Sequence, residues 1–327
     1  MSLSAPRFWQ AAPNTSLSAK LLSPLGALYH GEVQRRLASA TPYRADCPVL
    51  CVGNATMGGV GKTPFVRMLA QELENAGETP HILTRGYGGS LKGPVQVTSA
   101  HTADQVGDEP LMLSRDQTVW VSRDRPTGAR AAADAGASVI VMDDGFQNPS
   151  LVKDRSLLLV DAASLFGNRE VFPAGPLRER PEAALARADA VVSVLPSEDA
   201  MTPESLKAFA SGYPLAEAWF SIDHEAIPEG PLLAFCGIGR PERFEQSLAS
   251  AGARLAGFRA FADHHPFKPG ELGQLRREAT SLGAELVTTE KDFVRLAPAE
   301  RHGITPIPGV MRWRGGEQVL RLIKEML

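Results

Sequence analysis

The feature that most constrains this 327-residue chain is a short apolar run that leads directly into a glycine-rich segment. The apolar run is Val49–Val52, and the segment after it ends in Gly58-Gly-Val-Gly-Lys-Thr63. This order predicts a buried strand, a glycine-rich turn and a helix that opens at Lys62 and Thr63. Glycines let backbone N–H groups wrap phosphate oxygens, and the helix N-terminus adds partial positive charge. We therefore predict a nucleoside triphosphate bound by a phosphate loop at residues 56–63.

The loop residues have separate expected roles. The predicted nucleotide contacts are Thr56, Met57, Gly58, Gly59, Val60, Gly61, Lys62 and Thr63. Lys62 is expected to reach the outer phosphates, and the Thr63 hydroxyl is expected to ligate Mg²⁺. Thr56 stands where the usual motif has glycine, and Met57 stands where the similar loops of partitioning ATPases carry a lysine. A chance glycine turn is the alternative, but the flanking strand and helix favour nucleotide binding.

A second apolar run ends in two carboxylates. Val139–Met142 precedes Asp143 and Asp144, as in a Walker B strand, whose acid holds the metal beside a phosphate loop. The alternative is a pair of acids that opens a turn before Gly145. Because the same chain carries a phosphate loop, we favour the metal role.

Two further acid-containing segments allow more than one interpretation. In Gly107-Asp108-Glu109-Pro110 the acids either cap a helix, or Asp108 deprotonates an acceptor hydroxyl. In the segment that contains Asp263, His264 and His265, adjacent histidines without other obvious ligands make a poor metal site. A histidine that orients a carboxylate is at least as consistent with this pattern.

Several basic residues follow predicted strands. Arg85 and Tyr87 come after one strand, Arg123 comes after another, and Arg178 lies in a predicted loop. Ligands of open α/β sheets bind beyond the carboxyl ends of the strands, and arginine suits a phosphate there. Each of these residues taken singly could equally be a solvated charge. Thr289-Glu-Lys-Asp292 is either a turn or a nucleotide contact, and the sequence does not choose between them.

Apolar runs alternate with helical segments along the chain, which predicts an α/β fold with a mainly parallel sheet of the P-loop NTPase type. Asp223–Pro231 contains two prolines and a glycine, and this composition suits a linker. We therefore predict a P-loop domain at 1–222 and a smaller α/β domain at 223–327. Candidate strands are Val49–Val52, His81–Thr84, Val119–Ser122, Val139–Met142, Leu157–Val160 and Ala190–Val194, then Leu232–Phe235, Glu285–Thr288 and Ile304–Ile307. Candidate helices are Thr63–Asn75, Pro241–Ala251, Pro269–Leu282 and Gly316–Met326.

Charge and hydropathy limit the partners. A formal charge of −3 gives no reason to expect a nucleic acid. No apolar run approaches the length of about 18 to 20 residues that a membrane-spanning helix needs. Between Leu17 and Leu37, however, leucines recur at near-helical spacing among Lys20, Arg35 and Arg36. This segment either packs on its own domain or lies in a membrane interface.

Taken together, these motifs resemble the tetraacyldisaccharide 4'-kinase family, the lipid A 4'-kinases of Gram-negative bacteria. In chain order, the motifs are Gly-Asn-x-Thr-x-Gly-Gly-x-Gly-Lys-Thr, Arg-Gly-Tyr-Gly, Gly-Asp-Glu-Pro, Asp-Asp-Gly-Phe-Gln, Gly-x-Leu-Arg-Glu, Asp-His-His and Thr-x-Lys-Asp. They cover nearly the whole chain, from about Trp9 to Asp292. Many families share the phosphate loop, whereas the ordered set is specific.

The resemblance implies a kinase that moves the γ-phosphate of ATP to the 4'-hydroxyl of a tetraacyldisaccharide 1-phosphate. It implies two α/β domains with the site in the cleft between them. The residues that it assigns are Lys62 and Thr63 for the phosphates and Mg²⁺, Asp143 and Asp144 with Glu109 for the metal, Asp108 as general base with His264 as its partner, and Arg178, Arg123, Gln147, Arg85 and Tyr87 for the transition state or the substrate.

The resemblance also implies work at the cytoplasmic face of the inner membrane, because an acylated substrate sits in a bilayer. It therefore favours the membrane-contact interpretation of Leu17–Leu37, in a protein that we expect to be a monomer. The competing class is a nucleotide-driven switch, such as a partitioning or metallocentre-maturation ATPase. Met57 in place of the lysine counts against the partitioning ATPases.

Overall fold

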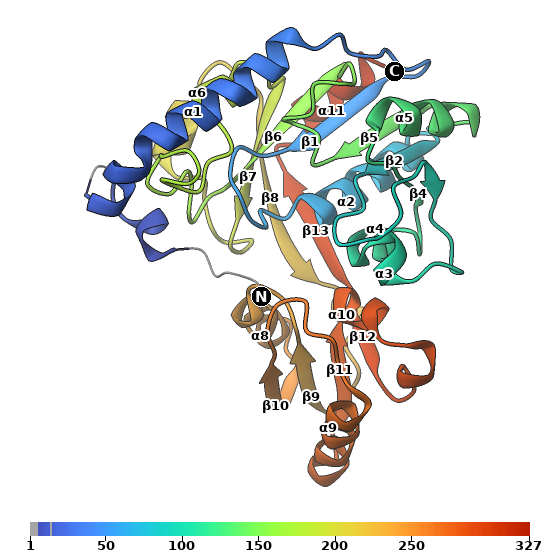
Figure 1. Ribbon diagram of the computed structural model, residues 1–327. Helices are drawn as coiled ribbons and strands as arrows, with labels where there is room; N and C mark the ends of the chain where they lie inside the picture. The colour runs from blue at the N-terminus through green and yellow to red at the C-terminus, as the bar shows by residue number, and fades with distance from the viewer. Residues whose placement is uncertain (1–5, 14) are drawn as a thin grey trace.

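The computed structural model describes residues 6–13 and 15–327, which form two separate β-sheets. The larger sheet has the strand order β13-β8-β7-β6-β1-β5-β2-β4-β3, and the smaller has the order β10-β9-β11-β12. Figure 1 shows the smaller sheet below the larger one, with β8 running toward it and β13 running away from it. Strands and helices alternate along most of the chain, so the predicted α/β fold with a mainly parallel sheet is confirmed.

The larger sheet is parallel except at its two edges. At these edges β3 runs antiparallel to β4, and β13 runs antiparallel to β8. Its strands are β1 (Val49–Gly53), β2 (Pro80–Thr84), β3 (Val95–Gln96), β4 (Thr118–Val121), β5 (Val139–Asp143), β6 (Arg155–Asp161), β7 (Ala190–Leu195), β8 (Leu215–Ile222) and β13 (Gly309–Arg314).

Helices cover both faces of the larger sheet, which explains why its central strands are apolar throughout. In β1, Leu50 and Val52 pack into one core, and Val49 and Cys51 pack into the core on the opposite face. The first core includes residues of α2 (Lys62–Asn75), α4 (Asp108–Leu113) and α11 (Glu317–Lys324). The second includes residues of α5 (Arg125–Asp134), α6 (Pro181–Leu185) and α7 (Glu204–Phe209).

The smaller sheet repeats this arrangement, with α8 (Pro241–Ser250) on one face and α9 (Pro269–Leu282) on the other. Its strands are β9 (Pro231–Cys236), β10 (Arg254–Ala260), β11 (Glu285–Thr289) and β12 (Thr305–Ile307), all parallel. Apart from the N-terminal helix α1 (Leu17–Ser39), the remaining helices are α3 (Ala103–Val106), α10 (Glu290–Arg295), η1 (Arg7–Gln10), η2 (His224–Ala226) and η3 (Pro298–Glu300).

The C-terminal segment corrects the predicted extent of the smaller domain. The sequence-based division places all of 223–327 there, but β13 pairs along its whole length with β8 of the larger sheet. Val319 and Ile323 of α11 also pack into the core of the larger sheet. The amphipathic pattern of this segment predicts a helix correctly, but periodicity carries no information about which core the helix covers.

The N-terminal helix α1 (Leu17–Ser39) lies along the outside of the larger sheet (Figure 1). At Gly26 the helix packs closely on the backbone of Val171, because an added Cβ would lie 2.6 Å from the Val171 carbonyl oxygen. Ser23 donates a hydrogen bond to Glu170 on the same side. No helix among the described residues is long and apolar enough to cross a membrane.

The close approach at Gly26 generates a prediction with a control in the same helix. Gly26→Ala should loosen α1, because the new methyl group meets a backbone carbonyl that cannot easily move. Gly31→Ala has no atom within 4 Å of the added Cβ, so it should stabilise the helix by about 0.5–1 kcal/mol. Hydrogen exchange of the amides of α1 measures both effects. Equal protection of α1 in the two variants would show that the contact at Gly26 does not hold the helix.

Candidate active site

The phosphate loop joins β1 to α2, as the sequence predicts. Gly61, at the N-cap of α2, has φ of 87°, and Gly58 has φ of 108°, conformations that glycine adopts without strain. The start of the loop is paired with a second segment: the Met57 N–H donates to Pro176, and the Arg178 N–H donates to Ala55. The loop that carries Arg178 is therefore fixed beside the phosphate loop by backbone hydrogen bonds.

The side chain of Asn54 holds the phosphate loop in place, a role that the sequence motifs did not predict. This fully buried side chain donates from Nδ2 to the carbonyl and hydroxyl oxygens of Thr56, both at 2.9 Å. Its Oδ1 accepts a hydrogen bond of 3.0 Å from Nζ of Lys62. Asn54 therefore holds both the loop and the lysine that is expected to meet the outer phosphates. The available signal was an asparagine between the apolar strand and the glycine-rich turn.

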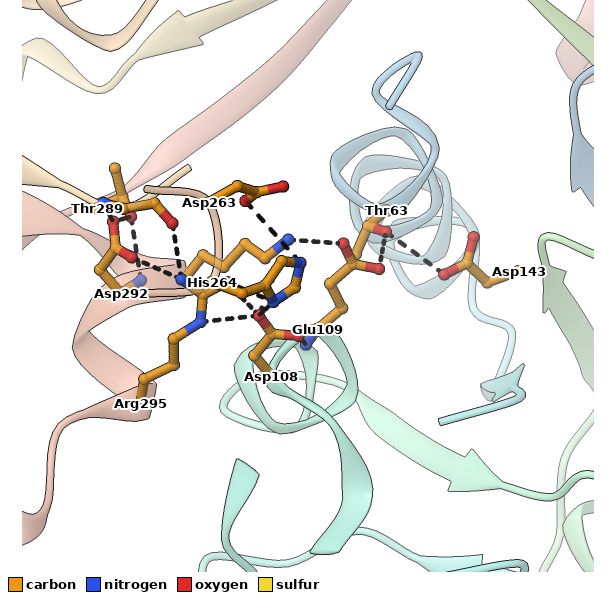
Figure 2. A network of polar contacts seen from close by, with 11 residues as sticks. Thr63, Asp108, Glu109, Asp143, Asp263, His264, Thr289, Asp292 and Arg295 are labelled. Atoms are coloured by element: carbon orange, nitrogen blue, oxygen red, sulfur yellow. Dashed lines mark hydrogen bonds and ion pairs between the residues drawn. The ribbon is translucent and has the colours of Figure 1, made fainter. Parts of the chain in front are cut away.

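An oxygen cluster lies beside the N-terminus of α2. The Thr63 hydroxyl is 3.2 Å from Oε2 of Glu109 and 3.5 Å from Oδ2 of Asp143 (Figure 2). The other carboxylate oxygen of Asp143 is buried and has no hydrogen-bond partner among the described residues. Burial, together with the charges of Glu109 and Asp144, raises the pKa of Asp143 to about 7. Oxygen ligands with an unpaired buried carboxylate oxygen fit a divalent cation such as Mg²⁺.

Asp144 turns away from this cluster. Its backbone φ is 52°. Its two carboxylate oxygens accept hydrogen bonds of 2.7 and 3.1 Å from the two terminal nitrogens of Arg178, and Oδ1 lies 3.5 Å from Nζ of Lys62. Burial opposes ionisation, but the charges of Lys62 and Arg178 outweigh it and hold the pKa of Asp144 below its usual value. The two adjacent acids thus have different surroundings: Asp143 faces Thr63, and Asp144 faces the cations.

Gln147 supports this arrangement through both ends of its amide. Its nitrogen donates to the Asn54 carbonyl at 2.9 Å and to Glu179 at 2.8 Å, and its oxygen lies 3.3 Å from Arg178. Glu179 is fully buried and also accepts two hydrogen bonds from Arg187. The sequence motif contains Glu179, but its structural role depends on contacts that the sequence does not reveal.

Asp108 and His264, which are far apart in sequence, are brought together across the two sheets. Nδ1 of His264 lies 3.3 Å from Oδ2 of Asp108, and the same oxygen accepts a hydrogen bond of 2.9 Å from Nε of Arg295 (Figure 2). Burial favours the neutral acid, but His264, Lys291 and Arg295 outweigh it and hold the pKa of Asp108 well below its usual range. The carboxylate is therefore ionised and oriented by the smaller sheet's segments.

The adjacent residues Lys291 and Asp292 make contacts in different parts of the molecule. Nζ of Lys291 lies 3.1 Å from Oε1 of Glu109 and 3.8 Å from Oδ2 of Asp108, so it reaches across to the larger sheet's acids. Asp292 is fully buried at the start of α10, where it accepts hydrogen bonds from Thr289 and from the Gly237 N–H. The sequence leaves both residues unassigned, because the contacts cross between elements distant in the chain.

Three of the predicted substrate contacts lie in loops just beyond the carboxyl ends of β2 and β4: Arg85, Tyr87 and Arg123. All are exposed, and no polar side-chain contact within the described part of the chain joins Arg85 or Tyr87 to the phosphate loop. Arg123 donates to the Gly89 carbonyl at 3.0 Å. Gly107 packs so closely on the Tyr87 carbonyl that an added Cβ would lie 2.6 Å away. The loop that carries Tyr87 therefore packs against Gly107, the residue immediately before Asp108.

Comparison with known proteins agrees with the geometry of this site. The family model of the tetraacyldisaccharide-1-P 4'-kinases (LpxK) matches residues 18–327. The chain is 49% identical over 317 residues to the tetraacyldisaccharide 4'-kinase of Phenylobacterium zucineum, covering 94% of each chain. It is 44% identical over 332 residues to that of Caulobacter vibrioides, covering 99% of each chain.

A solved structure is also similar over almost the whole chain. It is the "apo" form of LpxK from Aquifex aeolicus in complex with ATP, with 27% sequence identity and a TM-score of 0.75. The similarity covers 94% of this chain and 99% of the Aquifex chain. The ordered motifs, the site that they form and these similarities lead to one assignment: the chain belongs to the tetraacyldisaccharide 4'-kinase family.

Proposed function

We propose that this protein transfers the γ-phosphate of ATP to the 4'-hydroxyl of a tetraacyldisaccharide 1-phosphate, a step of lipid A biosynthesis. The observation that carries the proposal is a carboxylate–histidine pair, Asp108 and His264, placed next to a phosphate loop with its own cluster of acids. Family membership favours this kinase over the ATPase switch. The ATP in the related Aquifex aeolicus structure supports ATP as the donor.

Thr63, Asp143 and Glu109 are the residues that would hold Mg²⁺. When bound, the ion would neutralise charge on the β- and γ-phosphates. Asp144 is the neighbouring acid and pairs with Arg178 and Lys62, the two cations that would face the transferred phosphate. Arg178 would then be placed to stabilise the charge of the transition state, as arginine does in many phosphoryl transfers.

The proposed chemical step moves one proton and one phosphoryl group. Asp108 accepts the proton of the acceptor hydroxyl while that oxygen bonds to the γ-phosphorus. The bond from the γ-phosphorus to the bridging oxygen breaks, and ADP leaves. A carboxylate is a weak base for an alcohol, but a loose transition state requires little proton removal early in the step. His264, 3.3 Å from the carboxylate, would keep it oriented and share the proton.

We also propose that the smaller sheet and its helices act as a domain that closes the site. His264, Lys291 and Arg295 all come from this part and contact acids of the larger one. Arg85, Tyr87 and Arg123, exposed beyond the carboxyl ends of β2 and β4, would contact the lipid's polar head.

We propose a location at the cytoplasmic face of the inner membrane, and the N-terminal helix supports the membrane contact that this location requires. Leu17, Leu21 and Leu28 each expose more than 70% of their surface, and Leu25 exposes 53%, at positions that recur along one side of α1. Lys20, Arg35 and Arg36 are exposed on the same helix. An apolar stripe with basic neighbours favours contact with an anionic membrane surface. This surface would bring the enzyme to its acylated substrate.

The donor assignment is tested by incubating the protein with labelled ATP and the lipid disaccharide 1-phosphate, followed by chromatography of the product. Lys62→Ala should lower turnover by about 10²- to 10³-fold, because electrostatic stabilisation dominates phosphoryl transfer. Lys207→Ala, at an exposed ion pair far from the loop, is the control and should match the wild type. Turnover of Lys62→Ala within a few-fold of wild type, at unchanged thermal stability, would refute the assignment.

The paired action of Asp108 and His264 is tested by a double-mutant cycle. Asp108→Ala and His264→Ala should each lower kcat by about 10²-fold or more, and the double variant should be little worse than the poorer single variant. His265→Ala is a matched control, because His265 contacts Glu271 at 3.0 Å and belongs to the same loop. Fully additive losses in the Asp108–His264 cycle would mean that the two residues act independently.

Membrane contact is tested by replacing Leu21, Leu25 and Leu28 together with serine. The variant should bind anionic vesicles more weakly and show a higher apparent KM for the lipid, with the KM for ATP nearly unchanged. Met201→Ser with Leu282→Ser removes exposed apolar side chains elsewhere and should leave vesicle binding intact. Unfolding of the triple variant would instead identify the stripe as core, and unchanged flotation with vesicles would exclude it as the membrane contact.

A further inference from the structure

Arg295 makes an unusual set of contacts at the end of α10. Its Nε donates to Oδ2 of Asp108 at 2.9 Å, and its Nη2 contacts the same oxygen. Its Nη1 donates to the Gly237 carbonyl at 2.9 Å and to Oδ1 of Asp292 at 2.8 Å. All of its side-chain nitrogens are therefore engaged, and the side chain is only 10% exposed.

The far side of this guanidinium is anchored within the smaller sheet. Asp292 accepts from Arg295 with one oxygen, and its other oxygen accepts hydrogen bonds from Thr289 Oγ1 at 2.7 Å and the Gly237 N–H at 2.9 Å. Because Asp292 is fully buried at the start of α10, it cannot move without leaving these donors unpaired. Arg295 is thus held from behind while it holds Asp108 in front (Figure 2).

We propose that Arg295 is a positioning residue for the acceptor-activating carboxylate, and that Asp292 and the Gly237 carbonyl fix Arg295 for this task. The inference deepens the proposed kinase function and rests on it. Arg295 binds Oδ2 of Asp108, the oxygen that also faces His264 and Lys291. Oδ1, which accepts only from the adjacent Glu109 N–H among the described residues, is left for the acceptor hydroxyl.

Arginine suits this position for a chemical reason. It stays protonated in proteins, so it can hold the carboxylate firmly without competing for the proton that the carboxylate must receive. Its planar fork also reaches two carboxylates, Asp108 and Asp292, in one fixed geometry, which a lysine ammonium on a flexible stem cannot reproduce. His264 and Arg295 approach each other to 3.1 Å, so the same guanidinium also limits where the imidazole can lie.

A general attachment between the two parts of the molecule is the simpler explanation, and the chain offers a control for it. Arg67 of α2 contacts Glu290 of α10 at 2.8 Å, which also joins the larger sheet's helices to α10. This ion pair does not involve Asp108. If Arg295 only attached α10, then Arg67→Ala and Arg295→Ala would have similar consequences.

The experiment compares Arg295→Ala, Arg295→Lys and Arg67→Ala in the full-length protein, with ATP and the lipid disaccharide as substrates. Arg295→Ala should lower kcat by about 10²-fold, as expected for a misplaced reacting group, and leave the KM for ATP within about threefold. Arg295→Lys should recover only a small part of this loss. Arg67→Ala should keep kcat within about threefold of wild type. Added methylguanidine at millimolar concentration should raise the kcat of Arg295→Ala about tenfold and leave Lys62→Ala unchanged.

The outcomes separate the inference from the proposed function. If wild-type protein does not phosphorylate the disaccharide, the proposed function fails and takes the inference with it. If wild type is active but Arg295→Ala or Arg295→Lys retains full kcat, only the positioning role is overturned. Equal losses in Arg67→Ala and Arg295→Ala, without rescue by methylguanidine, would also overturn it. If Arg295→Ala does not fold, Arg295→Lys carries the test, because it keeps the charge and most of the side-chain volume.

Discussion

Repulsion between carboxylates at the N-terminus of α2 is the constraint on which the rest of the site depends. Glu109 and Asp143 lie within 3.5 Å of the Thr63 hydroxyl, Asp144 follows Asp143 directly, and Asp108 precedes Glu109. Such crowding of negative charge is unfavourable unless cations are placed against it. The structure places cations against these acids from two sides. Their placement determines which acids are held in ion pairs and which one keeps an unpaired oxygen.

On one side the cations belong to the larger sheet. Lys62 and Arg178 pair with Asp144 and leave Asp143 facing Thr63, with a buried oxygen that has no partner among the described residues. This division explains how adjacent acids in one sequence motif acquire different chemistry. The burial of Asp143 raises its pKa, and the cations beside Asp144 lower the pKa of that acid despite burial. Oxygen atoms around Thr63 are then available for the divalent cation that we propose for this site.

On the other side two cations, Lys291 and Arg295, come from the smaller part of the molecule. Lys291 lies against Glu109, and Arg295 and His264 lie against Asp108. The charges of Asp108 and Glu109 are therefore complemented only when the smaller part is in place. This gives a physical reason for building the site between two sheets: the acids alone repel one another, and the second sheet brings both the compensating charge and the histidine.

The sequence by itself determined the local architecture of the phosphate loop and the class of the fold. Glycines at Gly58 and Gly61 allow the backbone conformations of the loop, and the apolar strand before it is buried on both faces, as its composition requires. The ordered motifs also indicated the family. These features depend on neighbours in the chain, which the sequence states directly.

Tertiary structure alone decided how distant segments meet. It returned β13 and α11 to the larger sheet, because antiparallel pairing with β8 and burial of Val319 stabilise that arrangement. It brought Asn54 within hydrogen-bonding distance of Lys62, and it fixed Arg295 between Asp292 and Asp108. The sequence shows that such residues are polar or charged, but a hydrogen bond depends on a separation of about 3 Å and on direction. Only the packed chain sets that geometry between residues far apart in sequence.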